Sequence, residues 1–221
     1  TASFYEEVGS AGRSLARARK LQGKPLSFNN LADLDGALRA AFEYQSPAAV
    51  VVKHMNPCGA ATHEAGISEA FRLALSADPV SAYGGILAFN RPLEAEDVKT
   101  VFRARTFFEG LAAPGFSEDA LQILAKREKL RVLELPVDWA DSKPSGTDVR
   151  RIQGGWLLQD WDLGVEFDLQ PATDRVPTEA EEKALRFAWA ACRNVKSNAI
   201  VLARSDDGGF VLNGVGAGQM S

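Results

Sequence analysis

The chain has 221 residues, of which 46% are hydrophobic and 24% charged, and its formal net charge is −4. This composition predicts a soluble globular core and argues against disorder. Lys and Arg do not cluster, which argues against a nucleic-acid partner because neutralising phosphates needs a concentrated basic patch. Cys58 and Cys192 lie far apart in a sequence with no apolar run of membrane length, so we expect a reduced, cytoplasmic protein with no membrane partner.

The first predicted elements are a helix and a buried strand. We expect Asn30 to cap a helix that runs to about Tyr44, because apolar residues recur there at helical spacing. The β-branched run 50–52 is typical of a buried strand, which we place at 48–53. Lys53 and His54 follow it, in a stretch where Asn56-Pro57 supplies a bend. Ligands collect at the carboxyl ends of strands in open α/β sheets, so we expect a reaction site here.

Strands and helices alternate in the middle of the chain. The pattern predicts helices at 67–76, 94–105 and 117–126, and strands at 86–90, 106–112 and 130–135. Such alternation favours a mostly parallel sheet with helices packed on it. The irregular stretch 136–148 is the best candidate for an internal boundary.

The last part of the chain predicts a strand at 150–159 and then a capped helix from Thr178 to Val195, with Glu181 completing a capping box. One face of this helix carries four residues that we expect in the core, namely Leu185, Ala188, Trp189 and Cys192. A buried strand at 199–203, a hairpin turn at 206–209 and a glycine-rich turn from 213 follow. Such a glycine-rich turn lets backbone amides approach a ligand, although it also suits a plain tight turn.

Two kinds of chemistry fit the stretch after the first buried strand. His54, Cys58 and His63 could supply zinc ligands, but the second thiolate and the acid of the zinc deaminase motif are missing. The alternative is metal-free acid-base chemistry, in which His54 takes a proton from an attacking amine and the Lys53 ammonium stabilises an oxyanion. Solvated or structural roles for Lys53 and His54 also fit the sequence.

Five motifs in chain order carry a family resemblance. They are Gln-Gly-Lys-Pro-Leu-Ser-Phe-Asn-Asn (22–30), Lys-His-Met-Asn-Pro-Cys-Gly (53–59), Asp-Pro-Val-Ser-Ala-Tyr-Gly-Gly-Ile (78–86), Val-Lys-Ser-Asn-Ala-Ile-Val (195–201) and Gly-Val-Gly-Ala-Gly-Gln-Met-Ser (214–221). Together they resemble the AICAR transformylase part of the bifunctional purine biosynthesis proteins. The resemblance extends from about residue 22 to the last residue.

The resemblance implies an α/β fold related to cytidine deaminase, a three-layer α/β/α sheet without the deaminase zinc. We expect one subdomain at 1–135, a connecting segment at 136–177 and the start of a second subdomain at 178–221. The family's IMP cyclohydrolase domain would precede residue 1, and the rest of the second subdomain would follow residue 221.

The implied reaction transfers the formyl group of 10-formyltetrahydrofolate, the co-substrate, to the 5-amino group of AICAR ribonucleotide. The resemblance makes His54 the proton acceptor, Lys53 the transition-state stabiliser and Asn198 the group that orients the substrate amine and carboxamide. It implies further substrate contacts by Tyr83, Gly84, Glu109, Ser197 and Gln219, although some relatives carry Asp where this chain has Glu109. For Tyr83 the alternative is a loop aromatic that plugs the core.

The family forms homodimers that act on small molecules, with transformylase sites at the subunit interface. Two expectations follow for this chain. In the first, it is part of a formyltransferase that is active only when the missing segments are present. In the second, it is a folded, dimerising fragment without activity. A zinc-dependent hydrolase is the third and poorest reading.

Overall fold

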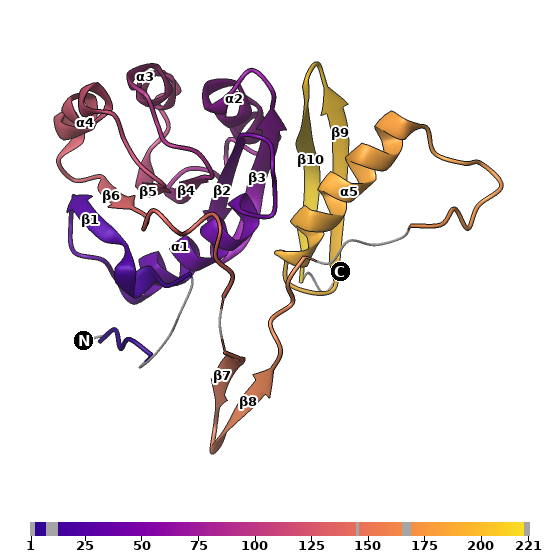
Figure 1. The fold of residues 1–221 in the computed structure, drawn as a ribbon, viewed down its shortest axis with the longest axis horizontal. Coiled ribbons are helices and arrows are strands. Elements are labelled where there is room, and N and C mark those ends of the chain that lie inside the picture. The colour runs from indigo at the N-terminus through magenta and orange to yellow at the C-terminus, as the bar shows by residue number, and fades with distance from the viewer. Residues whose placement is uncertain (1–2, 8–12, 145, 165–168, 219–221) are drawn as a thin grey trace.

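A mixed eight-stranded sheet lies at the centre of the molecule (Figure 1), in a computed structural model that describes residues 3–7, 13–144, 146–164 and 169–218. The strand order is β1-β6-β5-β4-β2-β3-β10-β9. The strands are β1 (Arg19–Gln22), β2 (Ala48–Lys53), β3 (Asn56–His63), β4 (Gly85–Phe89), β5 (Phe108–Ala113), β6 (Arg131–Glu134), β9 (Ala199–Asp206) and β10 (Gly209–Ala217). A separate hairpin consists of β7 (Asp148–Ile152) and β8 (Gly155–Gln159), where the sequence suggested one strand.

Helices cover both faces of the sheet, which confirms the predicted three-layer α/β architecture. One face carries α2 (Ile67–Ala77), α3 (Ala95–Arg103) and α4 (Glu118–Leu124), and the other carries α1 (Phe28–Ala41) and α5 (Glu179–Arg193). Two one-turn 3-10 helices, η1 (Leu15–Arg17) and η2 (Ala125–Arg127), lie in the connections. Within the described ranges, the helices are all too short or too polar to cross a membrane.

Strand β2 contributes to both hydrophobic cores, as its β-branched run predicts. Ala49 and Val51 pack in the cluster with α2, α3 and α4, whereas Val50 and Val52 pack in the cluster with α1 and α5. All four side chains are fully buried. A strand covered on both faces has no polar side to alternate with, which explains the continuous apolar run.

The predicted mostly parallel sheet is wrong for most strand pairs. Among the described strands, parallel pairing is limited to β4 with β5 and β5 with β6. The main cause is β3, where a turn was predicted. This strand returns antiparallel beside β2, with Lys53 opposite Asn56. The turn of this hairpin is His54-Met55, whose φ values of 55° and 62° give the left-handed backbone of a type I′ hairpin turn.

Helix α1 begins earlier than predicted. Its N-cap is Ser27, whose hydroxyl accepts a hydrogen bond from the Asn30 amide, while the Asn30 side chain accepts one from the Ser27 amide. Asn30 is therefore the third helical residue of a capping box and not the cap. The cap predicted at Thr178 is confirmed, with Glu181 completing the capping box of α5, and Ser117 caps the helix predicted from 117.

The C-terminal elements are more exposed than predicted. Helix α5 buries Phe187 and Ala191, whereas Leu185 and Trp189 are 54% and 52% exposed, so the predicted core face is wrong. Cys192 is only partly buried. Strand β9 is an edge strand whose Ile200 is 70% exposed, contrary to the predicted buried strand.

Strands β9 and β10 come after the stretch 136–148 that was predicted as an internal boundary, but both belong to the eight-stranded sheet. The hairpin between them turns at Asp207-Gly208, as expected, and β10 pairs with β3. Residues 213–217, predicted as a glycine-rich turn, continue β10 instead, with Gly214 opposite Leu202. The division into subdomains at 136–177 stays a prediction.

Candidate active site

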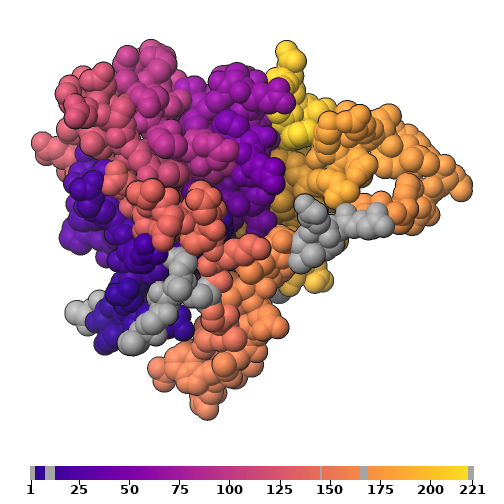
Figure 2. Space-filling model, in the orientation of Figure 1, coloured from indigo at the N-terminus to yellow at the C-terminus, as the bar shows by residue number. Residues whose placement is uncertain are grey.

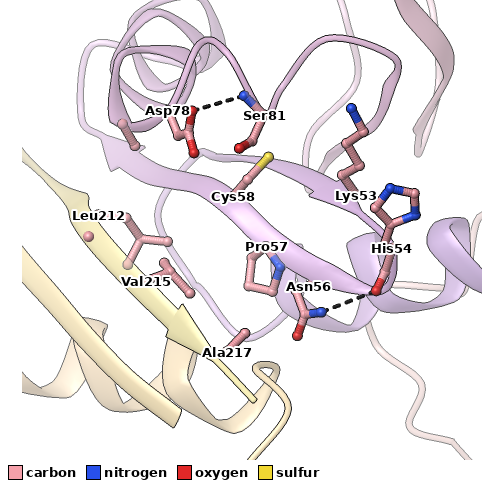
Figure 3. A pocket seen from close by; sticks show the side chains of 12 residues that line it. Lys53, His54, Asn56, Pro57, Cys58, Asp78, Ser81, Leu212, Val215 and Ala217 are labelled. Atoms are coloured by element: carbon pink, nitrogen blue, oxygen red, sulfur yellow. Dashed lines mark hydrogen bonds between the residues drawn. The ribbon is translucent and has the colours of Figure 1, made fainter. Parts of the chain in front are cut away.

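A cleft of about 590 Å³ opens where strand β10 leaves β3 (Figure 3). The described ladder between these strands joins 209–211 to 61–63, and the first half of β3 and the second half of β10 then line the cleft from opposite sides. The end of α2 forms the third wall. The lining residues are Lys53, His54, Asn56, Pro57, Cys58, Ala77, Asp78, Ser81, Leu212, Gly214, Val215 and Ala217.

Lys53 and His54 both reach this cleft because the chain turns between them. Successive side chains of an extended strand point to opposite faces, but His54 has left the strand and adopts φ 55°. Figure 3 shows both side chains leaving this turn at one end of the cleft. The predicted bend at Asn56-Pro57 is wrong in position, because Asn56 already belongs to β3.

The Lys53 ammonium is held by the loop before β4. Its Nζ donates to the carbonyl oxygen of Tyr83 at 2.7 Å. The Tyr83 side chain is 62% exposed and packs against Phe107 with ring centroids 5.6 Å apart, so it does not plug the core. Gly84 has φ 76°, which suits glycine, and its amide donates to the Phe107 carbonyl oxygen. This loop therefore lies beside Lys53, where a substrate contact was predicted.

The segment that carries Ser197 and Asn198 is tied to the His54 turn. Its Lys196 amide donates to Asn56 Oδ1 at 3.0 Å, and Asn56 Nδ2 donates to the His54 carbonyl oxygen at 3.1 Å. Ser197 and Asn198 follow directly and are exposed just before β9 begins at Ala199. Both residues therefore follow a segment bonded to this turn, but they are not among those that line the cleft.

Glu109 lies farther along this edge in an ion pair. Its carboxylate accepts a hydrogen bond from Arg131, whose guanidinium is 11% exposed and also donates to the carbonyl oxygens of Glu109 and Pro25. The side chain of Glu109 remains 38% exposed. The edge that gathers these groups is the carboxyl end of β2 but the amino end of β4, β5 and β6. Gln219, the last predicted site residue, lies outside the described residues.

Sequence reasoning missed three polar residues at or near the cleft. Asp78 lines it, and hydrogen bonds from the Ser81 side chain and backbone lower the pKa of its carboxyl group, so this wall is anionic. Asp33 on α1 accepts a hydrogen bond from the Met55 amide, and Arg131 holds Glu109. Asp78 begins the motif 78–86 but was given no role in the site. The partners of Asp33 and Arg131 lie 22 residues away, so no local pattern indicated these two residues.

The structure contradicts a zinc site built from His54, Cys58 and His63. In His63, Nδ1 accepts a hydrogen bond from the Ala65 amide and Nε2 donates to the Asp207 carbonyl oxygen, so both nitrogens already have backbone partners. Burial, followed by the charge of Asp78, raises the pKa of the Cys58 thiol to about 11. Within the described ranges, His, Cys, Asp and Glu form no group of three placed to hold a metal ion.

Comparison with known proteins identifies the family. The family model described as AICARFT/IMPCHase bienzyme matches residues 1–221. Two relatives named bifunctional purine biosynthesis protein PurH, from Magnetococcus marinus (strain MC-1) and Halalkalibacterium halodurans (strain C-125), are each 46% identical. Both alignments cover 100% of this chain, which spans 41% and 42% of the relatives' lengths. The chain therefore belongs to the AICARFT/IMPCHase bienzyme family.

Proposed function

We propose that the protein containing this chain is an AICAR formyltransferase of purine biosynthesis, with 10-formyltetrahydrofolate as co-substrate. The observation that carries the proposal is the common placement of Lys53 and His54 at one end of the cleft, with the segment before Asn198 bonded to the same turn. Family membership supports it, and so do the names of the two relatives.

The proposed reaction needs a base and a cation at the same carbonyl. The amine of AICAR is a poor nucleophile because its lone pair is conjugated with the ring and carboxamide. As its nitrogen bonds to the formyl carbon, the His54 imidazole takes the amine proton and the Lys53 ammonium stabilises the oxyanion. Collapse of the intermediate breaks the bond between the formyl carbon and N10 of the folate, and N10 leaves with a proton returned from His54. The products are the formylated nucleotide and tetrahydrofolate.

Substrate orientation is the role proposed for the surrounding loops. Asn198 would orient the amine and carboxamide of AICAR. The nucleotide and folate contacts proposed from the family resemblance are those of Tyr83, Gly84, Glu109, Ser197 and Gln219. We further propose that the complete protein is a cytoplasmic homodimer that also carries IMP cyclohydrolase activity in parts beyond this chain.

The test is tetrahydrofolate release from 10-formyltetrahydrofolate and AICAR ribonucleotide by the complete natural protein, compared with His54→Ala and Lys53→Ala variants. Removing either group should lower kcat by roughly 100-fold or more while circular dichroism stays unchanged. Lys99→Ala, which removes an exposed lysine of α3, is the control and should keep normal turnover.

Normal turnover by His54→Ala would refute the assignment of the base. The isolated chain is assayed in parallel. Release by the complete protein but not by the chain would show that this part of the protein is inactive alone.

A further inference from the structure

The turn that presents His54 has a backbone that its residues do not favour. His54 and Met55 have φ values of 55° and 62°, in the left-handed region. For residues other than glycine this backbone conformation is unfavourable, because Cβ lies close to the following carbonyl oxygen. Type I′ turns usually place Asn-Gly or Asp-Gly here for that reason. Contacts from outside the hairpin must therefore stabilise the turn.

Helix α1 supplies the contact to one side of the turn. Asp33 Oδ1 accepts a hydrogen bond from the Met55 amide at 2.7 Å. Gly36, one helical turn later, faces the same residue, since a Cβ added there would lie 3.8 Å from the Met55 Cα and carbonyl oxygen. The turn therefore lies against α1, and the hydrogen bond to Asp33 is its described polar contact with the helix. Asp33 is not among the residues that line the cleft, so its contact with His54 is indirect.

The other side of the turn is held through the His54 carbonyl oxygen. It accepts hydrogen bonds from Asn56 Nδ2 at 3.1 Å and from Lys196 Nζ at 3.4 Å. Asp33 is therefore the one contact among those described that fixes the Met55 amide, whereas two donors share the His54 carbonyl. Losing Asp33 removes the hydrogen bond to the Met55 amide and leaves those to the His54 carbonyl oxygen, so the two left-handed residues can relax toward other backbone angles.

We propose that Asp33 is a positioning residue for formyl transfer, which fixes the left-handed His54-Met55 turn and so aims the His54 imidazole into the cleft. The inference rests on the proposed role of His54. A small displacement of a catalytic group lowers the rate of the chemical step more than it weakens substrate binding, and about 1 Å can cost roughly 100-fold. The effect of losing Asp33 should therefore appear in kcat.

The experiment measures tetrahydrofolate release by the complete natural protein and its variants. Asp33→Ala should lower kcat by roughly 10- to 100-fold with little change in KM for either substrate. Asp33→Asn keeps an oxygen acceptor for the Met55 amide and should retain most of kcat. The control is Asp35→Asn on the same helix, whose carboxylate is 47% exposed and lies 3.9 Å from Arg39; it should leave kcat unchanged.

Met55→Gly separates positioning from a general effect on folding. Glycine adopts positive φ readily, so removing Asp33 in the Met55→Gly background should cost a smaller factor in kcat than in the wild type. Hydrogen exchange of the Met55 amide gives a readout that does not depend on activity, and Asp33→Ala should speed it. An Asp33→Ala variant with wild-type kcat, or the same loss in both backgrounds, would overturn the inference.

The unaltered complete protein and His54→Ala are measured alongside to separate three failures. If the unaltered complete protein releases no tetrahydrofolate, the proposed function itself fails. If His54→Ala turns over normally, the role of His54 as the base fails, and the positioning role of Asp33 fails with it. If His54→Ala is inactive while Asp33→Ala matches the wild type, only the positioning role of Asp33 fails.

Discussion

Replacing Arg131 by Met would test how Glu109 is held at the edge of the candidate site. The Arg131 guanidinium is 11% exposed and donates from Nε to the Pro25 carbonyl oxygen at 3.0 Å. Its Nη1 donates to the Glu109 carbonyl oxygen at 3.2 Å and also to the Glu109 carboxylate. Methionine has a similar length but no charge and no donor, so the substitution removes all three hydrogen bonds with little change in packing.

The expected loss in the free energy of unfolding follows from how exposed each hydrogen-bond partner of Arg131 is. A hydrogen bond from a charged donor contributes about 1.5 kcal/mol or more, so the two backbone carbonyls account for about 3 kcal/mol. The Glu109 carboxylate is 38% exposed, and an ion pair with such access to water adds less than about 1 kcal/mol. Arg131→Met should therefore lower the free energy of unfolding by about 3 to 4 kcal/mol, and Glu109→Gln by about 1 kcal/mol at most.

Urea unfolding of the chain, followed by circular dichroism, measures both values. Arg103→Met is the control, because Arg103 pairs with Glu96 at side-chain exposures of 66% and 59%, and it should cost less than about 0.5 kcal/mol. An equal cost for Arg131→Met and Arg103→Met would refute the reasoning. A coupling of 3 kcal/mol between Arg131→Met and Glu109→Gln would do so too, since it would place most of the energy in the ion pair.

Two further predictions concern the motif that contains His54. Gly59→Ala would place a Cβ 2.1 Å from the Ala74 carbonyl oxygen, which must push β3 from α2, so we expect a loss of about 3 kcal/mol in urea unfolding. Gly115→Ala, with 3.8 Å of space, is its control, and equal stability of the two variants would contradict the close approach. Because burial raises the pKa of the Cys58 thiol from 9.0 to about 11, iodoacetamide at pH 8 should alkylate it about 100-fold more slowly than a free thiol. The unfolded thiol ionises first, so the chain should also lose stability between pH 9 and 11, and Cys58→Ala should remove part of that slope. Alkylation as fast as that of a free thiol would contradict the burial.

The local elements and the position of the chemistry were accessible from the sequence. Three elements depend on residues at most a few positions apart, so a local sequence pattern predicts them. They are the buried strand at 48–53, the capped start of α5 at Thr178 and the hairpin turn at 207–208. Lys53 and His54 were placed at a strand end for the same reason, and the structure puts both of them on one cleft.

What only the tertiary structure decided depends on contacts between distant parts of the chain. The Lys196 amide and Asn56 are 140 residues apart in sequence, and their hydrogen bond brings the segment of Asn198 to the His54 turn. Helix α5 has more than one apolar stripe, and packing of Phe187 on Tyr44 and Phe210 selected the buried one. The left-handed turn at His54-Met55 contains no glycine that would indicate it in the sequence. A contact with Asp33 on α1 stabilises this backbone, which the local residues disfavour.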